Sequence, residues 1–373
     1  MTRILFIPEE LTAGSSERTP TLFRIMRARH EVVGLPTPWD RLLYDPARAK
    51  WPRYLLYLID KAILGARGLR LARRYRVELV FCETAHHALP GVGIAKLLGI
   101  RSVWDSHGNV RLFSRSLGKG RVFSYLAESL ERFLGHRVDA LITVSEVDAQ
   151  AYSEMGVDPS RIHVLPLSVS LADIDATAHR DEDGTSRTGA RTPVLFFFGS
   201  FKYAPNREAL EFIDDTLAPY LERNGVRCRI WIAGRDIPRR SFHPSVRVLG
   251  FVPNIYESIR KADLCLVPVW KGVGVITKVL DIMAVGTPVV LSSFAAQGID
   301  GLQDGVHATV APSRDAFPEL VVSCLSDPSR SREMAARARR LIEERYDYPR
   351  HLAQLDSILE GRAEGDRRKG TGT

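Results

Sequence analysis

The chain has 373 residues, of which 45% are hydrophobic and 26% are charged. This composition is typical of folded globular proteins and too apolar for an intrinsically disordered chain. At about 100–200 residues per domain, the length predicts two domains. The sequence contains no run of about 18 apolar residues and does not start like a signal peptide. We therefore expect a cytoplasmic protein.

Positive charge is concentrated in the first part of the chain. The net charge is +8, and residues 1–150 contain 23 Lys and Arg residues against 15 Asp and Glu residues. The asymmetry favours an anionic partner for this part, such as a membrane surface, a phosphorylated lipid or a nucleic acid. A solvated basic face would give the same composition.

The four cysteines are far apart in the sequence and form no C-x-x-C pair. This spacing predicts buried thiols rather than a disulfide framework or a cysteine metal site. They are Cys82, Cys228, Cys265 and Cys324.

Short apolar runs alternate with longer amphipathic stretches in two series, which is typical of parallel strands connected by helices. The pattern predicts an α/β protein with two Rossmann-like, doubly wound domains that face each other across a cleft. The first series of runs is 4–7, 31–35, 78–81, 102–104, 140–144 and 162–166, and the second is 194–198, 228–232, 246–249, 263–267, 288–291 and 308–310.

Changes in composition suggest the domain boundaries. Residues 171–193 are rich in Asp, Ala, Thr, Gly, Arg and Ser and are predicted to form a linker between the domains. We expect an N-terminal domain over 1–170, a C-terminal domain over 194–346, a helix over 347–361 that returns to the N-terminal domain, and a disordered tail over 362–373.

The segment after the run 263–267 carries the strongest local signal for a binding site. Ligands of open α/β sheets bind beyond the carboxyl ends of the strands. Here Gly272, Val273 and Gly274 precede an expected helix whose first turns carry Thr277, Lys278 and Asp281. Backbone amides at a helix N-terminus, with a lysine beside them, favour an anion. An ordinary strand, loop and helix with a surface ion pair would show the same pattern.

The same segment carries a family resemblance. Residues 278–290 read K-V-L-D-I-M-A-V-G-T-P-V-V and resemble the K-V-L-E-A-M-A-x-G-x-P-V-V signature of family 4 retaining glycosyltransferases, which have the GT-B fold. Residues 197–206 resemble the F-x-G-S-M-x-Y-x-P-N block of an exopolysaccharide-type subgroup. Residues 144–148 and 248–253 also match family segments in the expected order.

The resemblance implies a nucleotide-sugar donor in the C-terminal domain, an acceptor in the N-terminal domain and reaction in the cleft. It also implies no cofactor and no metal, because basic side chains neutralise the diphosphate leaving group. Lys278 matches the family lysine, and Arg235 and Lys202 are supporting candidates. Asp281 matches the acidic residue that binds the donor ribose. The other residues expected on the donor side are Gly199, Ser200, Phe251, Val252, Gly272, Val273, Gly274 and Thr277.

In the first half, Asp105, His107 and Asn109 follow an apolar run and resemble the D-x-H block of the family. The resemblance places His107 against the donor sugar or the acceptor, with Asp105 and Asn109 on the acceptor side. A lone histidine is more often structural than catalytic. Gly14 stands where the family has a Gly-Gly turn, and Val273 replaces the first Glu of the family's E-x7-E pair.

Two basic stretches, 51–76 and 111–125, combine Arg and Lys with aromatic and aliphatic residues. Such a pattern suits a helix lying on an anionic membrane, and equally a packed helix with a wet basic face. Peripheral association with the inner face of the cell membrane is therefore an expectation for this half.

The sequence thus predicts a hexosyl or related glycosyltransferase that retains anomeric configuration. We expect it to move a sugar from a nucleotide-diphosphate donor to a glycan or lipid-linked acceptor in cell-envelope or extracellular polysaccharide synthesis. The alternative is a catalytically degenerate GT-B protein that binds a nucleotide-sugar or a partner enzyme. A nucleic-acid partner is not expected, because no RNA- or DNA-binding module is recognisable.

Overall fold

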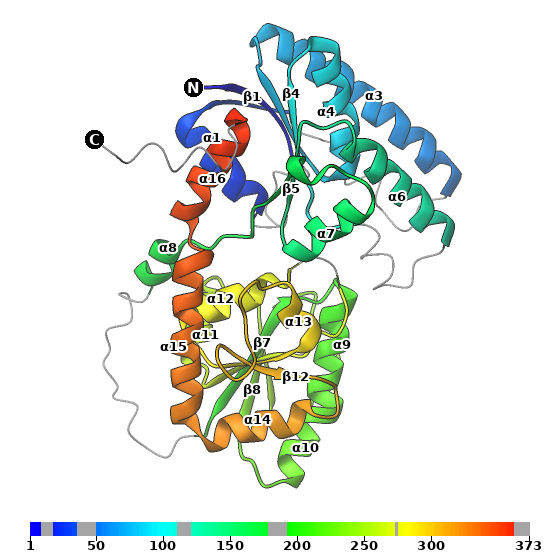
Figure 1. Cartoon of the computed structure of the whole chain (residues 1–373). Coiled ribbons are helices and arrows are strands. Elements are labelled where there is room, and N and C mark those ends of the chain that lie inside the picture. Colours follow the sequence, from blue (N-terminus) through cyan, green and yellow to red (C-terminus); the bar gives the residue numbers. More distant parts are fainter. Residues whose placement is uncertain (9–17, 36–49, 110–120, 178–191, 273–274, 362–373) are drawn as a thin grey trace, which may run out of the picture. The chain divides into compact units, whose positions relative to one another are not determined.

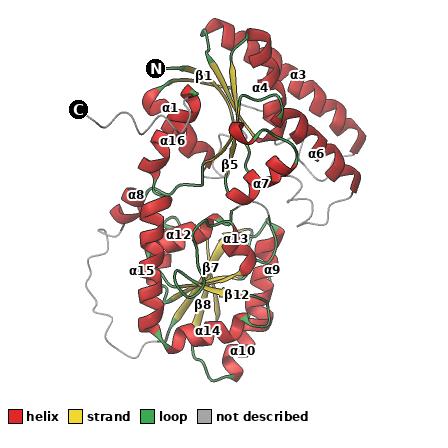
Figure 2. Ribbon diagram, in the orientation of Figure 1, coloured by secondary structure: helices red, strands yellow, loops and turns green. Residues whose placement is uncertain are grey.

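The computed structural model describes residues 1–8, 18–35, 50–109, 121–177, 192–272 and 275–361. Contacts divide the chain into two units (Figure 1). Unit 1 comprises Met1–Pro166 and His351–Thr373, and unit 2 comprises Leu167–Arg350. Each unit is a parallel sheet with helices on both faces (Figure 2).

Unit 1 contains a six-stranded parallel sheet in the order β2-β1-β3-β4-β5-β6. Successive strands are added on one side of β1 and then on the other, so the winding reverses between β1 and β3. Ligands of doubly wound sheets bind at such a reversal point. The strands are β1 (Arg3–Ile7), β2 (Glu31–Gly34), β3 (Leu79–Glu83), β4 (Arg101–Asp105), β5 (Ala140–Thr143) and β6 (Ile162–Val164).

The helices of unit 1 lie on both faces of its sheet (Figure 1). On one face α3 and α6 pack against α4, which lies over β3 and β4. On the other face lie α1 and the C-terminal helix. The bounds are α1 (Arg18–Arg29), α3 (Lys50–Arg74), α4 (Thr84–Leu98), α6 (Arg121–Gly135), α7 (Glu146–Glu154) and α16 (Tyr348–Glu360), with a 3₁₀ turn over Pro159–Arg161.

Unit 2 has the same architecture, with strand order β12-β11-β10-β7-β8-β9. Its winding reverses between β7 and β10, which are hydrogen-bonded neighbours. Phe196, Phe197 and Leu266 are fully buried in its core. The strands are β7 (Val194–Ser200), β8 (Arg229–Arg235), β9 (Val246–Gly250), β10 (Leu264–Val267), β11 (Val289–Ser292) and β12 (Thr309–Ala311).

The helices of unit 2 also cover both faces of the sheet. α11 and α15 pack against α12 on one face, and α9, α10 and α14 lie on the other (Figure 1). The bounds are α8 (Leu171–Ala176), α9 (Ala204–Phe212), α10 (Ala218–Arg223), α11 (Ile255–Lys261), α12 (Thr277–Val285), α13 (Ser293–Gln297), α14 (Phe317–Ser326) and α15 (Pro328–Arg345), with a π turn over Ile213–Leu217 between α9 and α10.

The last described helix changes unit near its start. His351 and the residues after it belong to unit 1. There Gln354 Nε2 donates to Val164 O at 2.7 Å, Arg101 donates to Leu359 O at 3.0 Å, and Asp356 pairs with Arg29. The C-terminal segment therefore completes the fold of unit 1.

The α/β class with two doubly wound parallel sheets, predicted from the alternating apolar runs, is confirmed. The segment expected to be a linker starts as helix α8, because Leu171 and Ile174 are buried in the core of unit 2. The tail expected over 362–373 lies outside the described residues. Three of the four free thiols are buried and Cys228 is half-buried. No described helix is long and apolar enough to cross a membrane.

Candidate active site

Lys278 lies at the point where the winding of unit 2 reverses. It sits in the first turn of α12, directly after the loop that follows β10. Its Nζ donates to Phe198 O of the neighbouring strand β7 at 2.7 Å and to Asn206 Oδ1 of α9 at 2.8 Å. The ring of Phe197 lies 4.4 Å from Nζ. Three elements thus position one ammonium group at the carboxyl ends of the two central strands.

Among the described residues, no carboxylate contacts Lys278. The residue is 8% exposed, and its hydrogen-bond acceptors in the described part of the chain are a carbonyl and an amide. Burial therefore lowers the pKa of Lys278 to about 7. A buried ammonium with neutral partners gains from an anionic ligand, and a diphosphate would supply that charge.

Glycines allow the ends of β7 and β8 to approach each other beside this lysine. Gly234 has φ +145°, and a Cβ there would lie 1.8 Å from Gly199 O. A Cβ on Gly199 would lie 3.0 Å from Lys278 Nζ. A side chain at Gly234 would separate the two strand ends, so this site requires glycine. A side chain at Gly199 would displace the ammonium group.

Exposed side chains lie at the ends of the strands that neighbour β7 and at the start of α12. Arg235 ends β8, and its guanidinium lies 4.7 Å from the ring centre of Phe251, which follows β9 and is 60% exposed. Lys202, Ser200 and Thr277 are also exposed, and Val252 is half-buried. Two cations and an exposed aromatic face near one buried ammonium could accommodate a phosphate-linked aromatic base.

Asp281 lies one turn after Lys278 on α12 and accepts a hydrogen bond from the hydroxyl of Tyr256 on α11 at 3.3 Å. Its carboxylate is only half-buried, so it could accept hydrogen bonds from ligand hydroxyls. Gly272 is buried, and a Cβ there would lie 2.7 Å from the hydroxyl of Tyr203. Val273, Gly274 and Gly14, which the sequence analysis singled out, lie outside the described residues.

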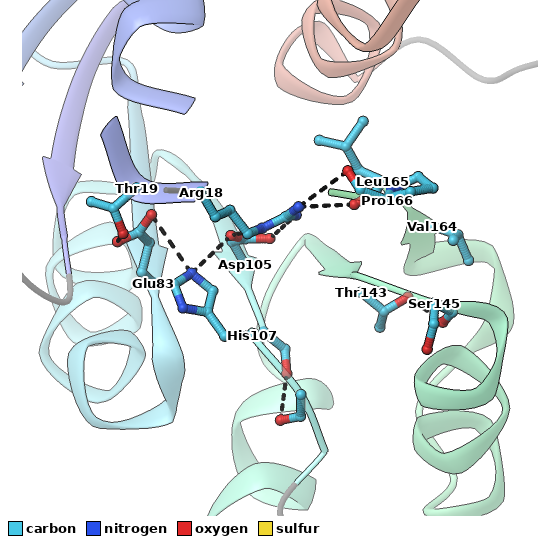
Figure 3. Close-up of polar contacts among 12 residues, drawn as sticks. Arg18, Thr19, Glu83, Asp105, His107, Thr143, Ser145, Val164, Leu165 and Pro166 are labelled. Atoms are coloured by element: carbon cyan, nitrogen blue, oxygen red, sulfur yellow. Dashed lines mark hydrogen bonds and ion pairs between the residues drawn. The ribbon is translucent and has the colours of Figure 1, made fainter. Parts of the chain in front are cut away.

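A second polar cluster lies at the carboxyl ends of β3 and β4 in unit 1 (Figure 3). Arg18 contacts both oxygens of Asp105, at 2.6 and 2.8 Å, and also donates to Leu165 O at 3.0 Å. Thr19 donates to Glu83 Oε2 at 2.7 Å. These contacts join the start of α1 to β3 and β4, across the reversal point of this sheet.

His107 is held between the two carboxylates of this cluster. Its Nε2 lies 3.2 Å from Asp105 Oδ2 and 3.7 Å from Glu83 Oε1, an arrangement that favours a proton on that nitrogen. Burial raises the pKa of Asp105, but the Arg18 guanidinium and His107 hold it well below its usual range. The Asp105 carboxylate is therefore ionised and fully buried, so it orients His107 and is not exposed to a ligand.

The three side chains Glu83, Asp105 and His107 each place one possible metal-ligating atom within 4.8 Å of the others. Arg18 already contacts both oxygens of Asp105, and a second cation there would be repelled by the guanidinium. The donor set therefore fits an ion-pair network better than a divalent metal.

Asn109, also expected on the acceptor side, is 1% exposed. Its backbone N–H donates to Asp148 Oδ1 at 3.0 Å and its side chain donates to Glu131 Oε2 at 3.4 Å. The structure thus places Asn109 inside unit 1, where it ties the segment after β4 to helices α6 and α7.

Known proteins resemble both units. Residues 9–168 match the family model described as glycosyl transferase 4-like domain, and residues 192–327 match the model described as glycosyl transferases group 1. The chain belongs to the family 4-like glycosyltransferases. No curated protein sequence matches it.

Several solved structures share the fold of this glycosyltransferase. Anabaena HepE in complex with UDP-glucose has a TM-score of 0.69 at 16% identity, covering 97% of this chain and 100% of HepE. Sucrose-phosphate synthase from Thermosynechococcus elongatus has a TM-score of 0.69 at 15% identity, and the match covers 97% of this chain and 99% of the synthase. A UDP-forming α,α-trehalose-phosphate synthase from Burkholderia xenovorans has a TM-score of 0.72 at 13% identity, and the match covers 97% of this chain and 100% of that synthase. At these identities the likeness shows the GT-B fold.

Sequence reasoning missed four polar residues of these two sites in this glycosyltransferase. Arg18 and Thr19 follow the loop after β1, in which Gly14 was the expected site residue. Glu83 carried a usable signal, because it is a charged residue at the end of the buried strand β3. Asn206 lies in the block 197–206 that resembles the family, but its contact with Lys278 joins residues 72 positions apart.

Proposed function

We propose that this protein is a retaining glycosyltransferase that uses a nucleotide-diphosphate sugar. The observation that carries the proposal is the buried ammonium of Lys278 at the reversal point of unit 2, which has only neutral partners in the described part of the chain. Charge develops on the departing diphosphate during glycosyl transfer, and a preorganised cation at that position stabilises it. The titles of similar structures name UDP, UDP-glucose and UDP formation, which supports a UDP-sugar as the first donor to test.

The remaining site residues have proposed roles in the same reaction. Arg235 and Lys202 assist Lys278 at the phosphates, Asp281 accepts the ribose hydroxyls, and Phe251 contacts the base. His107, oriented by Asp105 and Glu83, contacts the donor sugar or the acceptor hydroxyl. No protein nucleophile is required, because the leaving phosphate itself takes the acceptor proton in a front-face substitution. The match of residues 278–290 to the signature of retaining enzymes supports this mode.

The test is release of nucleoside diphosphate from a panel of nucleotide-sugars, with and without added glycan or lipid-linked acceptors. We expect turnover by the wild type, and a loss of at least about a hundredfold in Lys278→Ala. Lys261→Ala, which changes an exposed lysine of α11, should match the wild type. An α-linked product from an α-linked donor, seen by NMR, would support retention. Donor binding without turnover for any acceptor would favour the non-catalytic alternative.

We further propose that unit 1 associates with an anionic membrane, where a lipid-linked acceptor of envelope or extracellular polysaccharide synthesis would be found. Apolar side chains are exposed on α3 at Leu58, Ile59 and Ile63, and on α6 at Tyr125 and Leu126. Further along α3, exposed arginines follow at helical spacing. Apolar residues beside basic ones favour adsorption to anionic lipid. The arginines are Arg67, Arg70, Arg73 and Arg74.

Cosedimentation with vesicles tests the membrane proposal. Binding should require phosphatidylglycerol, weaken with salt and be lost in Leu58→Ser/Ile59→Ser/Ile63→Ser. Leu97→Ser, on the exposed side of α4, is the matched control. Equal binding to neutral vesicles, or no effect of the triple substitution, would contradict it.

A further inference from the structure

The side-chain amide of Asn206 contacts Lys278, and both its nitrogen and its oxygen make hydrogen bonds. Its Nδ2 donates to Ser200 O at 2.9 Å, and its Oδ1 accepts from Lys278 Nζ at 2.8 Å. An ammonium group only donates and a carbonyl oxygen only accepts, so this is the single orientation of the amide that satisfies both partners. The side chain is 8% exposed, and its two contacts fix it in place.

Three elements are fitted to each other around this amide. Asn206 lies in the first turn of α9, where its backbone N–H donates to Tyr203 O at 3.1 Å. A Cβ on Gly199, at the end of β7, would lie 2.7 Å from Asn206 Nδ2. Gly199, Asn206 and Lys278 are therefore the residues that meet where β7, α9 and α12 approach one another.

The charged groups on the surrounding elements leave the ammonium uncompensated. They include Lys202 after β7, Arg207, Glu208 and Glu211 on α9, Arg235 at the end of β8, Lys271 after β10 and Asp281 on α12. Glu208 pairs with Lys271 at 2.9 Å, and Arg207 donates to the carbonyls of Phe201 and Lys202. Among the described residues, Asn206 is the only side chain that accepts a hydrogen bond from Lys278.

We propose that Asn206 is a positioning residue, which holds the Lys278 ammonium at the ends of β7 and β10 with a neutral acceptor and so keeps its charge for the donor diphosphate. The inference rests on the proposed function. A carboxylate at this position would pair with the ammonium and cancel its attraction for an anion. An aliphatic side chain would leave the ammonium and Ser200 O without this partner.

The experiment is calorimetric titration with UDP-glucose from about pH 6.5 to about pH 8.5, in two buffers of different ionisation enthalpy so that proton uptake is measured. The wild type should bind with uptake of a proton, and its affinity should fall as the pH rises, because burial lowers the pKa of Lys278 to about 7 and the diphosphate raises it again. Asn206→Asp should bind at least about tenfold more weakly and take up no proton.

The control is Asn224→Asp, at an exposed asparagine after α10 whose side chain donates to Tyr220 O; it should match the wild type. Unchanged affinity and proton uptake in Asn206→Asp would overturn the inference. Equal weakening in Asn206→Asp and Asn206→Ala, with proton uptake retained in both, would also overturn it, because that result indicates a structural role alone.

A measurement without any ligand tests this inference separately from the proposed function. It can also be made if Asn206→Asp binds UDP-glucose too weakly for calorimetric titration. The pH dependence of Lys278 acylation, followed by mass spectrometry, reports the pKa of its amine. We expect a higher pKa in Asn206→Asp than in the wild type, since a carboxylate stabilises the ammonium, and an identical pKa would refute the coupling. Wild-type protein that binds no nucleotide or nucleotide-sugar would instead refute the proposed function.

Discussion

Lys278 illustrates how a single residue can favour ligand binding at the expense of folding stability. Its ammonium group is buried beside a carbonyl, an amide and an aromatic ring, and burial lowers its pKa from 10.5 to about 7. Between these pH values the unfolded chain binds a proton that the folded chain releases, so the stability contributed by this group rises with pH. The penalty on folding is fully present below about pH 7 and is lost above the unfolded pKa.

Lys278→Met should therefore stabilise the ligand-free protein while it abolishes donor binding. At pH 7 we expect a gain on the order of 3 kcal/mol in the unfolding free energy of unit 2. The gain should shrink as the pH approaches about 10.5. Urea unfolding of both proteins across this pH range measures the difference. A Lys278→Met variant less stable than the wild type at neutral pH would contradict the assigned burial cost.

At the scale of elements, the site depends on how closely the ends of β7 and β8 approach. The two strands pair in register as far as Ser200 and Arg235, which places both site loops side by side. The pairing passes through Gly199 and Gly234, where a Cβ on Gly234 would lie 1.8 Å from the facing carbonyl. Any side chain at Gly234 must separate the strands.

Gly234→Ala should separate the strand ends and weaken donor binding and stability together. We expect a loss of more than about 3 kcal/mol in the unfolding free energy of unit 2, from the clash and the positive φ. Gly225→Ala is the matched control, since Gly225 also has positive φ (+70°) but open space around its Cβ position. That variant should lose only about 1 kcal/mol. Similar losses in both variants would show that backbone conformation, and not the close approach, determines the cost.

The strands of both units could be predicted from the sequence, but the contacts between distant side chains could not. Strands buried on both faces appear as continuous apolar runs, so β3, β7 and β10 were recognisable from Leu79–Phe81, Val194–Phe198 and Leu264–Val267. Lys278 was recognisable because its site lies within one local segment. The contacts of Arg18 with Asp105 and of Asn206 with Lys278 join residues 87 and 72 positions apart. They depend on which strands are neighbours, and no local pattern encodes strand order.

At the scale of the whole molecule, the last described helix, α16, returns to the unit that contains β1. Residues after Arg350 belong to unit 1, where Asp356 contacts Arg29 and His30 and Leu359 O accepts from Arg101. Leu355 and Leu359 are buried there as well. The stability of unit 1 should therefore depend on a segment that follows unit 2 in the sequence.

A chain ending at Arg350 should lose stability in unit 1 alone. Hydrogen exchange should speed up in β1–β6 by at least about a hundredfold, since several buried contacts are removed together. Exchange in β7–β12 should stay unchanged. A chain ending at Gly361 is the control and should match the 373-residue chain. Faster exchange spread equally over both sheets would show that the segment stabilises the whole chain instead.

The central claim is that unit 2 binds a nucleotide-diphosphate sugar through Lys278. The most direct measurement is calorimetric titration of the wild type and Lys278→Ala with a panel of nucleotide-sugars, first without and then with magnesium. We predict binding with a dissociation constant on the order of micromolar for at least one donor, independent of magnesium and lost in Lys278→Ala. Binding that persists unchanged in Lys278→Ala, or that requires magnesium, would contradict the account.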